Sequence, residues 1–393
     1  MSIRSERRFD PLLIIPAMIL VGLGIVMVYS ASFAIAGERY RDSYFFLKKQ
    51  AMAAALGIAV MFCLAKLDYH RWQILAIPLL TLSGVLLGIL ILPGMRHEVG
   101  GSARWLRLSF FSFQPGELAK FALVIYLAHS LTKKEGKMKS FKAGFLPYIL
   151  ILGVFFALVL KQPDFGTGIV FVALVFLLLF AAGTRLLFLG SAVVAVLPVL
   201  FFLVTRAHYR LERLLIYLNP WSDPGHAGFQ IIQSFLAFGA GKLLGVGLGD
   251  GRQKLFFLPE VHTDFIFSVI GEELGLVGVT LVMGLFVFLI LRGFWACYRA
   301  PDLFGNYLAL GMTLLIGLQT LLNMGVVMGL LPTKGSTLPF ISHGGTSLMV
   351  NLMAVGILLN ISSQGVKLGD ENHHGRGGNR RASLPGPGSG GSL

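Results

Sequence analysis

The chain has 393 residues, of which 55% are hydrophobic and only 13% are charged, and its formal net charge is +14. Soluble domains carry about a quarter charged residues, so this composition excludes an ordinary soluble globular protein. The positive charge does not indicate a nucleic-acid-binding protein, because the cations are spread over many short loops. The two cysteines, Cys63 and Cys297, are expected to be free thiols.

The apolar residues come in long uninterrupted blocks. Many reach about 18 residues or more, the length that a helix needs to cross the hydrocarbon core of a bilayer. A transmembrane strand would instead alternate over about ten residues. We therefore predict an all-α polytopic membrane protein with about ten transmembrane helices. In chain order, the spans are expected at residues 11–35, 48–66, 73–93, 115–132, 144–161, 167–184, 187–205, 265–291, 306–330 and 345–364.

The distribution of basic residues predicts the orientation. An even number of spans puts both termini on one side, together with the basic N-terminal tail and the lysine-rich loop Lys133–Lys142. The positive-inside rule makes this side the cytoplasm, so we expect an integral protein of the cytoplasmic (inner) membrane. The expected parts are a cytoplasmic tail at 1–10, a ten-helix domain at 11–364 and a disordered cytoplasmic tail at 365–393.

One loop on the outer side, at about 206–264, is much longer than the others. Structureless loops of this length are uncommon unless they have a function. Arg206–Leu218 has arginines at helical spacing and predicts an interfacial helix. Gln230–Ala240 predicts a re-entrant helix, and the glycine-rich segment Gly241–Gly251 predicts irregular backbone.

Charged side chains gather in five segments on the proposed outer side. Charges at membrane depth are costly and usually functional, so each one is a candidate site residue. The segments are Gly100–Leu108 with Arg104 and Arg107, Gln114–Lys120 with Glu117 and Lys120, Gln162–Thr167 with Asp164, Phe257–Phe267 with Glu260, His262 and Asp264, and Pro332–Ser347 with Lys334 and His343. Carboxylates, arginines and lysines in this arrangement suit an anionic, phosphorylated, lipid-linked substrate.

Several of these residues also fit structural roles. Glu117 and Lys120 are three residues apart on one helix face and fit an intrahelical ion pair. Asp164 and Asp264 each precede a predicted span and fit helix N-caps. Arg104 and Arg107 fit anchors for lipid headgroups. The residues alone leave these alternatives open.

Four blocks together resemble the signature of a known family. They read GSARWLRL…FQPGELAK, QPDFGT, FLPEVHTDFIFSVIGEELGLVG and LPTKGSTLPFISHGGTSL. Their order is similar to that of the SEDS family (shape, elongation, division, sporulation), and the resemblance runs from the first span to about Ser363. NPWSDP at Asn219–Pro224 and TKGSTLPFISHGG resemble the division branch more than the elongation branch.

The resemblance implies a ten-helix fold and a peptidoglycan glycosyltransferase that polymerises lipid II at the division septum. It places the essential aspartate of the family at Asp264, in the block that also holds His262. It places the other site residues of the family at Arg104, Glu117, Lys120, Asp164, Glu260 and Lys334. The implied partners are a class B penicillin-binding transpeptidase and the regulatory membrane proteins of the division complex.

The expected chemistry is an inverting glycosyl transfer. A sugar hydroxyl is a poor nucleophile, so we assign Asp264 as the general base that takes its proton. Arg104, Lys120 and Lys334 are the candidates for stabilising the leaving pyrophosphate. A divalent cation, Mg²⁺ or Mn²⁺, is a further hypothesis. Its candidate ligands are Asp264, Asp164 and Glu117.

Two other functions fit the composition. A flippase that transports lipid II would use essential polar residues near the membrane midplane that face each side in turn. The charged segments here crowd toward one face, which favours the enzyme. A scaffold that only positions the division machinery would tolerate Asp264→Asn, whereas the enzyme would not.

Overall fold

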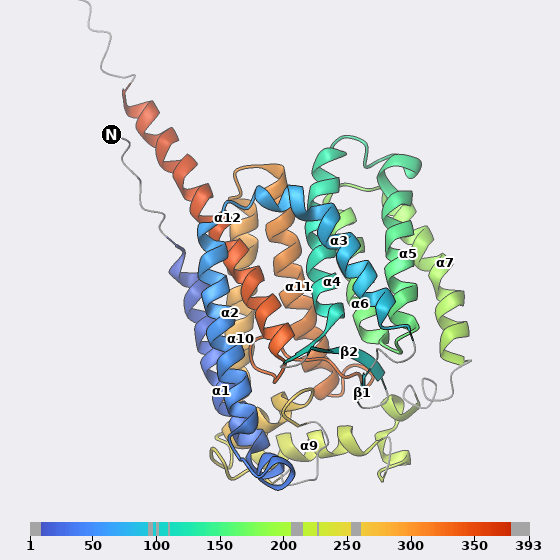
Figure 1. The fold of residues 1–393 in the computed structure, drawn as a ribbon, viewed down its shortest axis with the longest axis vertical. Coiled ribbons are helices and arrows are strands. Elements are labelled where there is room, and N and C mark those ends of the chain that lie inside the picture. Colours follow the sequence, from blue (N-terminus) through green and yellow to red (C-terminus); the bar gives the residue numbers. More distant parts are fainter. Residues whose placement is uncertain are drawn as a thin grey trace, which may run out of the picture.

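The computed structural model describes residues 9–92, 97–99, 102–108, 111–205, 215–225, 228–252 and 261–378, and its main feature is a bundle of long helices (Figure 1). Each of the ten predicted spans overlaps one helix. In chain order, these helices are α1 (Pro11–Tyr40), α2 (Phe45–Lys66), α3 (Arg71–Ile89), α4 (Pro115–Lys133), α5 (Leu146–Leu160), α6 (Phe165–Ala181), α7 (Leu186–Thr205), α10 (Ile266–Tyr298), α11 (Leu303–Val327) and α12 (Gly345–Gly378).

Within the described residues, seven helices are long and apolar enough to cross a membrane, counting α5 together with the π-helical turn Phe141–Phe145 before it. Of the remaining three, α4 is more polar and α6 is shorter, while the count covers only Leu186–Pro198 of the 20-residue α7. All three run beside the others in the same bundle (Figure 1). The polar character of α4 comes in part from Glu117 and Lys120 near its start. The prediction of an all-α polytopic membrane protein is confirmed.

Side-chain caps fix where some helices begin. The Asp10 side chain accepts a hydrogen bond from the Leu12 amide at 3.0 Å and caps α1, whose first residue is Pro11. Asp302 caps α11 by accepting from the Gly305 amide at 3.0 Å. Such caps satisfy amide donors that the first helical turn leaves without partners.

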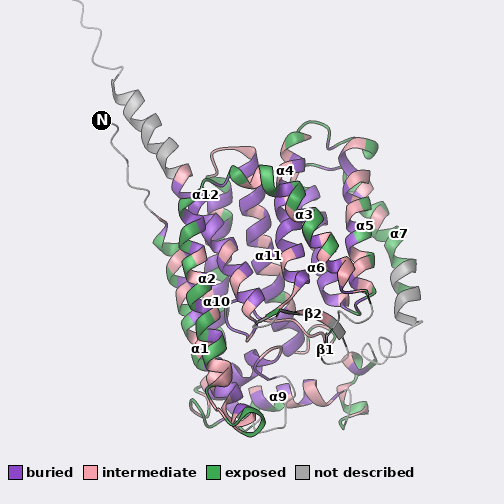
Figure 2. Cartoon of the chain, viewed as in Figure 1, coloured by how far each residue is buried: buried purple, intermediate pink, exposed green. Residues whose placement is uncertain are grey.

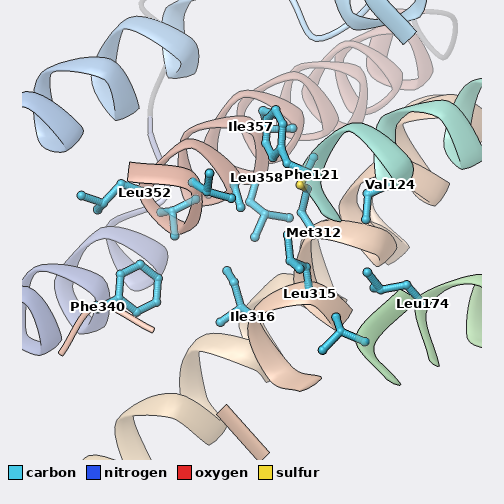
Figure 3. Packing of buried hydrophobic residues seen from close by; sticks show 14 of the residues in the cluster. Phe121, Val124, Leu174, Met312, Leu315, Ile316, Phe340, Leu352, Ile357 and Leu358 are labelled. Carbon is cyan, nitrogen blue, oxygen red and sulfur yellow. The ribbon is translucent and has the colours of Figure 1, made fainter. Parts of the chain in front are cut away.

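The centre of the bundle is formed by α11 and α12. In α12, 83% of the most apolar window is buried, and in α11 67%, against 22% in α3 (Figure 2). Side chains of α11 and α12 pack against α4 and α6 there (Figure 3). Examples are Met312, Leu315 and Ile316 of α11, Leu352, Ile357 and Leu358 of α12, Phe121 and Val124 of α4, and Leu174 of α6. The outer helices expose apolar side chains, as helices in lipid do.

A small antiparallel sheet connects α3 to α4. Its strands are β1 (His97–Val99), β2 (Ser102–Leu108) and β3 (Phe111–Phe113), in the order β1-β2-β3. Arg107 of β2 is paired with Ser112 of β3. The sequence does not predict these strands, two of which have only three residues. We call the end of the bundle that carries β2 and α9 (Phe229–Gly241) the loop end, and the opposite end, where α1 begins, the terminal end (Figure 1).

The long loop at about 206–264 contains two short helices among its described residues. A short 3-10 helix spans Pro220–Ser222, and α9 covers the helix predicted at 230–240. The segment 242–252 after α9 is irregular, as predicted. The helix predicted at Arg206–Leu218 lies mostly outside the described residues, with only 215–218 helical within them.

Helix α10 is broken at Gly275, where φ is 65° and ψ is −163°. The irregular segment after α9 fills the break. The amides of Leu276 and Val277 donate to the Lys242 and Leu243 carbonyls at 3.0 and 3.1 Å. In return, the amides of Val246 and Gly247 donate to the carbonyls of Glu272 and Glu273 at 3.0 and 3.1 Å. Backbone polar groups in a membrane must find internal partners, and this loop provides them.

The C-terminal helix is longer than predicted. The predicted span ends at 364, whereas α12 continues to Gly378. The predicted tail at 365–393 therefore begins within this helix, and its residues 379–393 lie outside the described part of the chain.

Candidate functional site

The charged residues singled out in the sequence come from separate elements that meet at the loop end. Arg104 lies in β2, Glu117 and Lys120 in the first turns of α4, Asp164 at the start of α6, Asp264 just before α10, and Lys334 between α11 and α12. Glu260 lies outside the described residues.

Glu117 and Lys120 form a buried pair on α4. The Lys120 ammonium donates to Glu117 Oε1 at 2.7 Å, and each side chain is 5% exposed. The second carboxylate oxygen, Glu117 Oε2, accepts from the Gln319 side chain of α11 at 3.0 Å. The predicted intrahelical pair is therefore confirmed. Both Glu117 oxygens are engaged, and removing either charge would leave the other buried without its partner.

Asp164 combines a capping role with a charge pair. Its carboxylate caps α6 by accepting from the Thr167 amide at 3.2 Å and from the Thr167 hydroxyl at 2.7 Å. Arg104 Nε lies 3.7 Å from Asp164 Oδ1. Burial raises the pKa of Asp164, but the Arg104 guanidinium, the Thr167 hydrogen bonds and the Lys334 ammonium outweigh it and hold this pKa below its usual value. Asp164 is therefore an ionised carboxylate.

Lys334 lies directly against the first turn of α6. A Cβ added to Gly166 would lie 1.5 Å from Lys334 Cε, so only glycine leaves room for this side chain. Burial, with help from Lys120 and Arg104, lowers the pKa of Lys334 to about 8, although Asp164 and Glu117 act in the opposite direction.

Among the described residues, Lys334 makes no ion pair within 4.0 Å. A half-buried cation that no carboxylate neutralises within the described residues is well suited to hold an anionic ligand.

Asp264 is positioned against the residue after Lys334. A Cβ added to Gly335 would lie 2.6 Å from Asp264 Oδ2 and 3.6 Å from a terminal nitrogen of Arg104. The carboxylate of Asp264 and the guanidinium of Arg104 thus both lie next to Gly335, the residue that follows Lys334. The structure places the N-cap position of α10 at Phe265, one residue after Asp264.

His262 lies in a cluster of aromatic rings with Phe46 and His343. The centroid of the Phe46 ring of α2 lies 4.4 Å from the centroid of the His262 ring and 5.1 Å from that of the His343 ring. The His343 amide donates to the His262 carbonyl at 2.9 Å, which ties the loop before α10 to the loop before α12. Burial, together with His262 and Lys49, lowers the pKa of His343 to about 3, so His343 is neutral near pH 7.

Several buried polar atoms at the loop end have no hydrogen-bond partner within the described residues. They are Gln50 Oε1, Arg104 Nε, Gln319 Oε1, Asn323 Oδ1, Ser336 Oγ and His343 Nδ1. Buried polar atoms in proteins almost always find a protein or water partner. Three of them, Arg104 Nε, Asn323 Oδ1 and Ser336 Oγ, belong to side chains next to Asp164, Asp264 or Lys334, so these atoms are available to a polar ligand.

The donor set for a metal is less complete than the sequence suggested. Within the described residues, no three His, Cys, Asp or Glu side chains are placed to hold a metal ion. Of the three candidate ligands, Glu117 is engaged by Lys120 and Gln319, and Asp164 by Thr167. A divalent cation at Asp264 stays a prediction.

The sequence patterns missed several polar residues of this site. Gln50 of α2 donates to the Ser342 carbonyl at 3.2 Å, and Gln319 and Asn323 of α11 reach Glu117 and the Asp264 backbone. All three lie within apolar spans, where a lone polar side chain is itself a functional signal. The sequence could therefore have marked these three residues as candidates, but it could not have predicted which groups they contact.

The FtsW/RodA/SpoVE family of cell cycle proteins matches residues 10–367. The chain belongs to this SEDS family. It is 49% identical over 364 residues to the probable peptidoglycan glycosyltransferase FtsW of Geobacter metallireducens, covering 93% of this chain and 97% of that relative. It is 44% identical over 360 residues to stage V sporulation protein E of Bacillus subtilis, covering 90% and 96%. These matches support the FtsW branch of the SEDS family.

Two solved structures share the fold. A chain of a peptidoglycan synthase complex is 31% identical, with a TM-score of 0.74 over 91% of this chain and 98% of that chain. The rod shape-determining protein RodA of Thermus thermophilus is 29% identical, with a TM-score of 0.65 over 90% and 96% of the two chains. The fold predicted from the sequence blocks is therefore confirmed.

Proposed function

We propose that the chain is a peptidoglycan glycosyltransferase that polymerises lipid II by inverting transfer. The observation that carries the proposal is the surface at Gly335, the residue after Lys334, where the Asp264 carboxylate and the Arg104 guanidinium both lie. A candidate base and candidate anion-binding cations thus occupy one site. Relatives named as peptidoglycan glycosyltransferases support the reaction class.

Asp264 acts as the general base. The 4-hydroxyl of the acceptor GlcNAc attacks C1 of the donor MurNAc, and the hydroxyl proton passes to the Asp264 carboxylate as the new bond forms. Attack from the face opposite the leaving group inverts C1. The bond from C1 to the pyrophosphate oxygen breaks, and undecaprenyl pyrophosphate leaves.

Lys334 and Arg104 stabilise the leaving pyrophosphate. Lys334 is the stronger candidate, because its side chain packs against Gly166 and makes no ion pair among the described residues. Arg104 also pairs with the Asp164 carboxylate. The Lys120 ammonium is already hydrogen-bonded to Glu117, so Lys120 contributes through its electrostatic potential and not through direct contact. Fixed charges aimed at a developing anion in a water-poor site are among the largest contributions to catalysis.

The flippase alternative is not favoured. Transporters hold their substrate near the bilayer midplane, between halves that open alternately. Here Arg104, Asp164, Asp264 and Lys334 all lie at the loop end of the bundle. This one-sided placement supports an enzyme that works at one membrane face.

The proposed location is the cytoplasmic (inner) membrane at the division septum, with both termini in the cytoplasm and the loop end outside. The lysine-rich loop between α4 and α5 at the terminal end supports this orientation. The proposed partners are lipid II, a class B penicillin-binding transpeptidase and regulatory proteins of the division complex. Similarity to a chain from a peptidoglycan synthase complex supports the transpeptidase.

Glycan polymerisation from lipid II by the purified protein with its transpeptidase tests the proposal. Wild type should make polymer, and Asp264→Asn should lose at least about 10²-fold in rate, because general-base catalysis contributes about 10²–10⁴-fold. Asp250→Asn is the matched control, since Asp250 is an exposed aspartate of the same loop. If no protein polymerises while labelled lipid II crosses proteoliposome membranes, the flippase replaces the enzyme.

A further inference from the structure

The Asn323 side chain connects the two loops that carry the proposed base and the proposed anion-binding lysine. Asn323 lies near the end of α11 and is 1% exposed. Its amide nitrogen donates to the Asp264 carbonyl at 2.9 Å and also to the Ser336 carbonyl. Asp264 is 59 residues from Asn323 in sequence, and Ser336 is 13 residues from it.

The contact at Gly335 shows why this connection matters. Gly335 lies between Lys334 and Ser336, and the Asp264 carboxylate lies directly against it. A movement of either loop would change the distance between Asp264 and Lys334. Helix α11 is among the most buried helices of the bundle, so it is a rigid reference for both loops.

The chemistry of the amide group explains the choice of asparagine. A side-chain amide carries two N–H donors on one nitrogen, so it can serve two carbonyl groups at once. Aspartate would place an anion against two carbonyl oxygens, serine offers one donor, and alanine offers none. Asn323 Oδ1 has no partner within the described residues, so the side chain is oriented by its donors alone.

We propose that Asn323 is a positioning residue that sets the spacing between Asp264 and Lys334. This inference rests on the proposed glycosyl transfer. Asn323 acts through the two backbone carbonyls and takes no part in proton transfer. Misplacing reacting groups by about 1 Å can cost about 10²-fold in rate, so loosening this connection should lower kcat more than it raises KM.

The test compares two buried asparagines. Asn360 on α12 is 0% exposed, donates to the Ala65 carbonyl at 2.8 Å and accepts from the Tyr69 amide at 3.0 Å, far from the site. Wild type, Asn323→Ser, Asn323→Ala and Asn360→Ala are purified with the transpeptidase. The measurements are kcat and KM for lipid II, the thermal unfolding midpoint, and hydrogen exchange of segments 261–265 and 333–344.

Asn323→Ala should lose about 10- to 100-fold in kcat with KM changed less than about threefold. Asn323→Ser should fall between this variant and wild type, and both should exchange faster in the two loops. Asn360→Ala should lower the unfolding midpoint but keep kcat and loop exchange near wild type.

Unchanged kcat and loop exchange in Asn323→Ala would overturn the inference. Equal kcat losses in both alanine variants would also overturn it, because they indicate a purely structural role. If wild type makes no polymer, the proposed glycosyl transfer fails, while hydrogen exchange still shows whether Asn323 holds the two loops.

Discussion

Lys334 is half-buried among other charges, and its ammonium group makes no ion pair with a carboxylate within the described residues. A lysine in this position is more sensitive to pH than an exposed lysine, since burial and the neighbouring cations lower its pKa to about 8. Near neutral pH it is still mostly protonated. Binding of an anionic pyrophosphate would favour the charged form and raise this pKa again.

This pKa predicts an alkaline limit for activity. In the free enzyme, kcat/KM should fall about tenfold per pH unit above pH 8, because the neutral amine no longer attracts the pyrophosphate. The corresponding limit in kcat should lie at higher pH, since the bound anion raises the pKa. In Lys334→Met, kcat/KM should be lower, and its fall above pH 8 should be absent. A limb near pH 8 that persists in Lys334→Met would show that another group titrates.

At the scale of elements, the break in α10 joins the long loop to a membrane-spanning helix. Gly275 adopts a positive φ, and a Cβ there would lie 2.3 Å from the Gly245 amide nitrogen. Two buried glutamates secure the same region. Glu272 accepts from the Arg252 amide at 2.7 Å, and Glu273 accepts from the Ser30 hydroxyl of α1 at 2.7 Å. The break is therefore held by backbone pairing and by carboxylates.

Gly275→Ala should destabilise the protein strongly. The positive φ disfavours a side chain, and the added Cβ meets backbone atoms that cannot move independently, so we expect a loss of about 2 kcal/mol or more. Gly284→Ala on the same helix is the control, because nothing lies within 4 Å of its added Cβ. The thermal unfolding midpoint in detergent is the measurement. Similar midpoints for the two variants would contradict the account of the break.

The whole molecule is polarised between its two ends. The charged site, the sheet and α9 lie at the loop end, whereas the lysine-rich loop Lys133–Lys142 lies at the terminal end (Figure 1). The central helices α11 and α12 are largely buried and carry no charge of the site within their spans. A rigid centre with charges at one face suits a catalyst that meets its lipid-linked substrate from one side.

Thiol labelling tests the proposed orientation. Cysteines are introduced separately by Lys139→Cys, at an exposed residue of the terminal end, and Gly225→Cys, at an exposed residue of the long loop, with Cys63 and Cys297 replaced by serine. A membrane-impermeant maleimide should label Gly225→Cys in intact spheroplasts. It should label Lys139→Cys only after permeabilisation. The reverse pattern would mean that the site faces the cytoplasm.

The membrane class and the helix positions could be predicted from the sequence because lipid imposes a local rule. A span must be a long apolar run, so each helix is visible in its own residues. The N-cap at Asp164 and the pair of Glu117 with Lys120 were also predictable, since their partners lie three residues away. The strands β1 and β3 were not, because three residues carry too little pattern to indicate a strand.

The sequence by itself determined the membrane fold, the family and the blocks that hold the site. Only the tertiary structure decided how those blocks meet. It brought Lys334 against Gly166, Asp264 against Gly335, and Asn323 between the two loops. The physical reason is that close packing between helices depends on atoms far apart in the chain, and hydrophobic periodicity records only which face is apolar.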